Sequence, residues 1–191
     1  MKEKVKKQKA EEKKQEAEKQ NSKIGAVNVM RSIKIEKVLL SGGATAENLA
    51  KEKRLIEIIS GEKAKVSVSR KRIPTLGVRP GLEVGVFVTI RGKKAFDMLK
   101  RLLGAVDNTI KEKQISENHF SFGIKEYIEI PGMEYQRDVG IRGLNATVDF
   151  ARPGLRVKRR KIKASSVPAK QHIPREEIIK FMQEAFKTKF V

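Results

Sequence analysis

The sequence has no cysteine and no tryptophan, and its aromatic residues are two tyrosines and eight phenylalanines. Without cysteine the chain can form no disulfide, bind no Cys-ligated zinc or iron–sulfur group and use no thiol in catalysis. Several of the few aromatic residues fall on positions that the hydrophobic pattern assigns to a core. We therefore do not expect a row of base-stacking platforms of the kind used by single-strand-binding proteins.

Long apolar runs are also missing. The longest uninterrupted runs are only a few residues, whereas a membrane-spanning helix needs about 20. The first residues show no basic segment followed by an apolar one, which is the pattern of a secretory signal. The sequence therefore predicts no membrane partner and is compatible with a cytoplasmic location.

Acidic residues are scarce relative to basic ones. The chain has 43 Lys and Arg against 23 Asp and Glu, a formal net charge of +20. Such a charge opposes compaction by self-repulsion unless a polyanion or salt neutralises it. With the membrane disfavoured, nucleic acid is the expected partner.

No arrangement of residues points to catalysis. The only histidines, His119 and His172, are more than fifty residues apart, and each is interpreted as a surface or satisfied residue. The stretch "SGGATAE" (41–47) joins a strand pattern to a helix pattern but lacks the Lys-Ser/Thr ending of a phosphate-binding loop. We expect no enzyme, no cofactor and no metal site.

Residues 1–22 consist almost entirely of Lys, Glu, Gln and Ala. Such a segment forms helix readily but has almost nothing to bury. It is predicted to be a polar tail, disordered or marginally helical; the alternative is a basic arm that orders on RNA. Residues 23–191 are predicted to form a single RNA-binding domain that ends in a C-terminal helix.

The hydrophobic pattern within that domain alternates between two periods. Alternating apolar residues predict strands at 32–41, 63–69, 83–92, 119–130 and 143–154, and helical spacing predicts helices within 42–61, 93–106 and 174–186. The predicted fold class is α+β: a largely antiparallel sheet of about five strands with helices packed on one face, plus basic loops and the polar tail.

Two segments concentrate positive charge. The first, "SRKRIPTLGVRPG" (69–81), carries four cations and no acid between two predicted strands. The second extends from Arg152 to Lys163. One interpretation of both is a merely solubilising loop, but like charges gathered this closely repel one another unless phosphates lie nearby. Because the charge lies in loops and tails rather than on a recognition helix, backbone and shape recognition of folded RNA fits better.

Seven motifs occur in a familiar order: "NVMRSIKIEKVLLSGG", "SGEKAKVSVSRK", "GVRPG", "VTIRGKKAFDML", "FSFGIKEYIEIPGMEY", "VGIRGLNATVDFARPG" and "REEIIKFMQEAF". In this order and spacing the chain resembles the ribosomal protein L five family, which binds 5S ribosomal RNA. The archaeal and eukaryotic branch is the more similar one, and the resemblance covers roughly residues 28–187.

The resemblance implies a structural protein of the large ribosomal subunit that anchors 5S rRNA in the central protuberance. Its implied partners are 5S rRNA, large-subunit rRNA, other proteins of the central protuberance and, through a bridge, a small-subunit head protein of the S thirteen family. The segment 69–81 resembles the family's loop that contacts tRNA in the peptidyl site. The residues expected there are Arg70, Lys71, Arg72, Thr75 and Arg79.

In the family, three polar positions touch 5S rRNA, and this chain keeps the usual residue at only one of them. Thr89 matches, Ser41 stands where Asn is usual, and Glu62 stands where Gln is usual, so it cannot donate a hydrogen bond when ionised. The full set of expected rRNA-binding residues is Arg31, Ser41, Glu62, Lys63, Thr89, Arg91, Arg152, Arg156, Lys158, Arg159, Arg160, Lys161 and Lys163. The alternative function is a non-ribosomal RNA chaperone or an accessory factor for RNA modification.

Overall fold

A computed structural model describes residues 28–45 and 47–191, and the chain divides into two units, Met1–Ser32 and Ile33–Val191. In the first unit the described part is a 3-10 turn, η1 (Val29–Arg31), where the Asn28 side chain accepts a hydrogen bond from the Met30 N–H at 3.0 Å. The predicted tail over 1–22 lies outside the described residues. The single domain from residue 23 onward stays a prediction.

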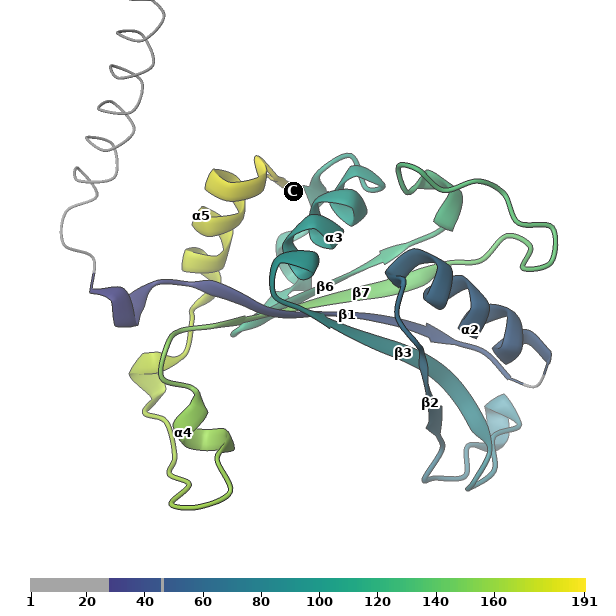
Figure 1. Ribbon diagram of the computed structural model, residues 1–191, viewed down its shortest axis with the longest axis horizontal. Helices are drawn as coiled ribbons and strands as arrows, with labels where there is room; N and C mark the ends of the chain where they lie inside the picture. The colour runs from purple at the N-terminus through teal and green to yellow at the C-terminus, as the bar shows by residue number, and fades with distance from the viewer. Residues whose placement is uncertain (1–27, 46) are drawn as a thin grey trace, which may run out of the picture. The chain divides into compact units, whose positions relative to one another are not determined.

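The second unit is built on a six-stranded sheet in which all neighbouring strands run antiparallel (Figure 1). The strand order is β2-β3-β1-β7-β6-β5. The strands are β1 (Lys34–Gly43), β2 (Lys65–Val68), β3 (Glu83–Arg91), β5 (Ile115–Ser116), β6 (His119–Ile124) and β7 (Leu144–Ala151). A separate parallel pair joins β4 (Thr109–Ile110) to β8 (Lys189–Phe190).

Three helices cover one face of this sheet (Figure 1). They are α2 (Glu47–Ser60), α3 (Lys93–Gly104) and α5 (Arg175–Phe186). In α3, buried residues at helical spacing, among them Ala95, Leu99 and Leu102, make one apolar side. In α5, Glu176 and Glu177 lie in the first turn, where the helix dipole favours negative charge.

The connections contain several single turns. They are α4 (Arg156–Arg159) and the 3-10 turns η2 (Pro74–Leu76), η3 (Glu112–Gln114), η4 (Tyr127–Glu129) and η5 (Ala169–Gln171). The segments that carry α4 and η2 leave the sheet on the side away from α2, α3 and α5 (Figure 1).

The two faces of the sheet differ in chemistry because side chains alternate along each strand. On the helix-covered face lie buried apolar residues such as Leu40, Val88, Phe122 and Val148. One irregularity interrupts β1, where the register with β7 shifts between Ile35 and Lys37, so that Glu36 is the additional residue.

The predicted α+β class, with an antiparallel sheet and helices on one face, is confirmed. The strand expected over 119–130 ends at Ile124, and the chain then turns through η4. The short strands β4, β5 and β8 were not expected from the sequence. Within the residues that the structure describes, no helix has the length and apolar character needed to cross a membrane.

Candidate nucleic-acid interface

The sheet face opposite the helices, called here the open face, is mostly polar. The strand register arranges its residues in three rows that cross β3, β1, β7 and β6. From β3 to β6 the rows are Arg91–Lys37–Asp149–His119, Thr89–Leu39–Thr147–Ser121 and Phe87–Ser41–Asn145–Gly123. Lys37 and Asp149 form an ion pair of 2.9 Å within the first row.

Three expected rRNA-binding residues, Ser41, Thr89 and Arg91, share this open face. Beside them is a shallow hollow of about 400 Å³, lined among others by Ser121, Asn145 and Thr147. Their hydroxyl and amide groups can both donate and accept hydrogen bonds, which suits the 2′-hydroxyls and phosphates of RNA. Sequence reasoning missed these residues, although they occupy the polar positions between the apolar ones of β6 and β7.

Glu62 and Lys63 lie apart from this group, in the turn between α2 and the edge strand β2. The Glu62 carboxylate forms an ion pair with Lys94 Nζ at 3.3 Å. The cation partly compensates the charge that would otherwise repel a phosphate, although an exposed pair of this kind is weak.

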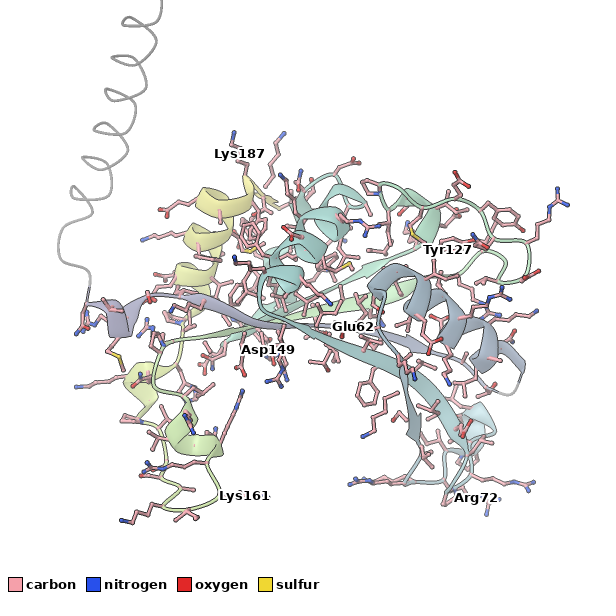
Figure 2. All side chains as sticks on the ribbon, in the orientation of Figure 1. Glu62, Arg72, Tyr127, Asp149, Lys161 and Lys187 are labelled. Atoms are coloured by element: carbon pink, nitrogen blue, oxygen red, sulfur yellow. The ribbon has the colours of Figure 1, made fainter. Side chains whose placement is uncertain are left out.

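The first basic segment, 69–81, forms a hairpin extension between β2 and β3. Backbone hydrogen bonds from Ser69 N to Leu82 O and from Gly81 N to Ser69 O close its base, and a bridge between Ile73 and Val78 closes its outer part. Val78 is buried, whereas the residues expected to contact tRNA are exposed, and Arg72 projects outward (Figure 2). These are Arg70, Lys71, Arg72, Thr75 and Arg79.

The second basic segment, Arg152–Lys163, contains residues in two different situations. Arg152 has a side chain only 9% exposed, which forms an ion pair with Glu177 of α5 and donates to Lys170 O at 3.1 Å. Arg159 forms an ion pair with Glu36, and Arg160 Nε donates to Lys163 O at 2.7 Å.

The remaining cations of this segment are exposed, and Lys161 lies near its tip (Figure 2). They are Arg156, Lys158, Lys161 and Lys163. Direct contact with RNA stays a prediction for every residue of the segment. For Arg152 the structure shows a packing role, because its guanidinium ties the end of β7 to α5.

Arg31 lies in η1 of the first unit and is exposed. Over the residues that the structure describes, no group of three His, Asp or Glu side chains could hold a metal ion.

Comparison with known proteins gives a consistent result. A family model described as the C-terminus of the ribosomal protein L five family matches residues 83–184. A protein of Nanoarchaeum equitans named large ribosomal subunit protein uL5 is 46% identical over 158 residues, covering 81% of this chain and 94% of that protein. Proteins of the same name from Sulfurisphaera tokodaii and Methanobrevibacter smithii are 36% and 34% identical, each covering 86% of this chain and 96% and 99% of their own lengths.

Proposed function

Because the chain belongs to the ribosomal protein L five family, we propose that it binds 5S rRNA and anchors it in the central protuberance of the large subunit. As a member of this family it is a structural, non-enzymatic protein of the large subunit of the cytoplasmic ribosome. The proposal includes contacts with large-subunit rRNA and neighbouring proteins, and a bridge to a small-subunit head protein of the S thirteen family.

One observation supports RNA binding on the open face. The basic segments 69–81 and 152–163 both leave the sheet on its uncovered side, away from the three helices (Figure 1). Hydroxyl, amide and cationic groups therefore line the face between two positively charged projections. Backbone contacts from the cations would position an RNA, and the polar groups of the open face would contact its sugars and base edges.

The two projections have different roles in this proposal. The segment 152–163 continues from β7, a central strand of the open face, and contacts 5S rRNA together with Ser41, Thr89 and Arg91. The segment 69–81 extends from the β2–β3 edge and carries its own backbone closure, so it can contact the peptidyl-site tRNA without altering the sheet.

Filter binding to an archaeal 5S rRNA transcript tests the proposal. The logarithm of the affinity should fall with the logarithm of salt concentration at a slope of several units, since each neutralised phosphate releases about 0.7–0.9 counterions. Thr89→Val on the open face should weaken binding several-fold, while the control Thr109→Val in β4, outside the six-stranded sheet, should not. A flat salt response, or equal affinity for an unrelated structured RNA of the same length, would contradict the proposal.

A further inference from the structure

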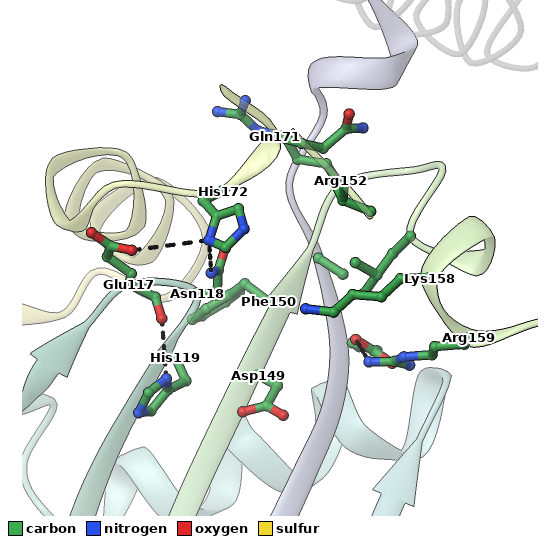
Figure 3. Close-up of a pocket in the computed structure, with 14 residues that line it drawn as sticks. Glu117, Asn118, His119, Asp149, Phe150, Arg152, Lys158, Arg159, Gln171 and His172 are labelled. Carbon is green, nitrogen blue, oxygen red and sulfur yellow. Dashed lines mark hydrogen bonds and ion pairs between the residues drawn. The ribbon is translucent and has the colours of Figure 1, made fainter. Parts of the chain in front are cut away.

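A cavity of about 450 Å³ opens where the open face meets the second basic segment (Figure 3). Its walls come from β1, the turn before β6, the end of β7, α4 and the residues in and around η5. Both histidines of the chain line it, together with Leu155 and Val167. Phe150 borders it too, but its ring packs against Phe120 and Phe181 in the core. Its size lies within the usual range of small-molecule sites, roughly 300–1,000 Å³.

The hydrogen bonds around His172 fix the tautomer of its neutral ring. Asn118 Oδ1 accepts from the backbone N–H of Ile173 at 2.8 Å, which identifies Asn118 Nδ2 as the donor group. That amide lies 3.2 Å from His172 Nδ1, so Nδ1 accepts and the proton resides on Nε2. The second ring nitrogen points away from Glu117 (Figure 3), and it offers an N–H donor to the cavity.

Lys158 supplies a second donor. Its side chain extends from α4 with the ammonium group directed toward β7, into the cavity (Figure 3). Among the described residues no ion pair engages it, whereas three other charged residues of the lining, Glu36, Asp149 and Arg152, are each paired. Glu36 pairs with Arg159, Asp149 with Lys37, and Arg152 with Glu177.

The combination favours an uncharged flat group with hydrogen-bond acceptors over a bare anion. Phosphate buried against Leu155 and Val167 would lose hydration on that side without compensation, and the carboxylate of Glu117, which pairs with no Lys or Arg among the described residues, would repel it. A nucleobase can place its ring against the apolar wall and its acceptors toward Lys158 and His172. Guanine O6 and N7, or the carbonyl oxygens of uracil, provide such acceptors.

We propose that this cavity receives one unstacked nucleotide of the bound 5S rRNA, with guanine or uracil as its base. The inference rests on the proposed function, because it assigns a subsite to the same RNA. The position of the cavity supports it, since His119 and Asp149 belong to the open face and Lys158 to the second basic segment. Recognition of splayed-out bases is the usual route by which proteins read RNA sequence.

The histidines make the test direct, because the chain has only two and both line the cavity. In the imidazole NMR spectrum of the full chain, saturating 5S rRNA transcript should shift the His172 signal through the ring current of the inserted base. Inorganic phosphate at the same ionic strength should not reproduce that shift. Saturable 5S rRNA binding with an unchanged His172 signal, or the same shift with phosphate, would overturn the inference and leave the proposed function intact. Absence of 5S rRNA binding would overturn the proposed function itself.

The second test fills the cavity with a larger side chain and measures RNA binding. Val167→Trp adds bulk to the lining without changing a charge, and it should lower 5S rRNA affinity about tenfold and abolish the RNA-induced His172 shift. The matched control is Val191→Trp at the exposed C-terminal residue, which should preserve both. Circular dichroism melting confirms that each variant is folded. A folded Val167→Trp protein with wild-type affinity would overturn the inference.

Discussion

The side chain of Glu52 in α2 lies against Gly42 of β1, in the space that a Cβ on this glycine would occupy. The Glu52 side chain is only 3% exposed, and its Oε2 lies 3.8 Å from Arg142 Nη1. Its Oε1 is buried and has no hydrogen-bond partner among the described residues. The absence of a side chain at Gly42 therefore allows α2 and a buried carboxylate to approach the sheet.

Gly42→Ala should destabilise the fold, because the new methyl group would overlap the Glu52 side chain, including its Cγ. Overpacking of a buried site costs about 1–3 kcal/mol, and urea denaturation measures the loss as a lower midpoint. The matched control is the adjacent Gly43→Ala, whose Cβ would meet only Val84 O at 3.9 Å, an ordinary contact. Equal losses for the two variants would contradict this account.

Glu52 should also give stability a pH dependence of unusual sign. Burial raises the pKa of its carboxyl above the usual 4.5, and the Arg142 guanidinium offsets the shift only in part. The folded chain therefore retains a proton that the unfolded chain has lost, so the contribution of Glu52 to stability falls as pH rises from about 4.5 through the raised folded pKa.

Comparison with Glu52→Gln isolates this contribution, because the amide does not titrate. The free energy of unfolding of the wild type, relative to the variant, should decrease between about pH 4 and pH 8 at constant ionic strength. Urea denaturation across that range measures the difference. A difference that stays constant or grows with pH would show that burial does not control this carboxyl.

Sequence periodicity predicted the central strands well because each has one apolar, buried face. The expectation of a strand over 83–92 corresponds closely to β3, and that over 143–154 to β7. The strand predicted over 119–130 was wrong beyond Ile124, where Tyr127 and Ile130 continue the apolar pattern but are buried outside the sheet. Tyr127 Oη accepts from Gln136 N–H at 2.8 Å, a contact with a later loop that local alternation does not reveal.

The candidate site was predictable to a similar extent. Composition located both basic segments, and most of their cations are exposed. It could not separate Arg152 from its neighbours, because its burial depends on Glu177, 25 residues further along the chain. The strands β4 and β8 have two residues each and pair across the domain, so they leave no local pattern.

Arg152 and Lys161 should therefore respond differently to substitution by alanine. Arg152→Ala removes the partner of Glu177 and a hydrogen bond to Lys170 O, and it should lower the free energy of unfolding by about 1–3 kcal/mol. Lys161 is exposed, so Lys161→Ala should change the free energy of unfolding by no more than about 0.5 kcal/mol. If Lys161 contacts a phosphate, its loss should reduce the salt slope of 5S rRNA binding by about one unit. A loss of stability in Lys161→Ala, with an unchanged stability and a reduced salt slope in Arg152→Ala, would contradict these two roles.

Reversing charge in the two basic segments should separate tRNA contact from 5S rRNA binding. Replacing Arg70, Lys71 and Arg72 with Glu should weaken peptidyl-site tRNA binding to reconstituted large subunits but change 5S rRNA affinity less than about twofold, because the backbone bonds that close this hairpin remain. The matched control replaces Arg156, Lys161 and Lys163 with Glu, the same change in charge on exposed residues of the other segment. This control should lower 5S rRNA affinity at least about a hundredfold, since three phosphate contacts become repulsive. If 5S rRNA affinity fell to the same degree in both triple variants, net charge alone would govern binding. The proposal that one segment contacts tRNA and the other 5S rRNA would then be wrong.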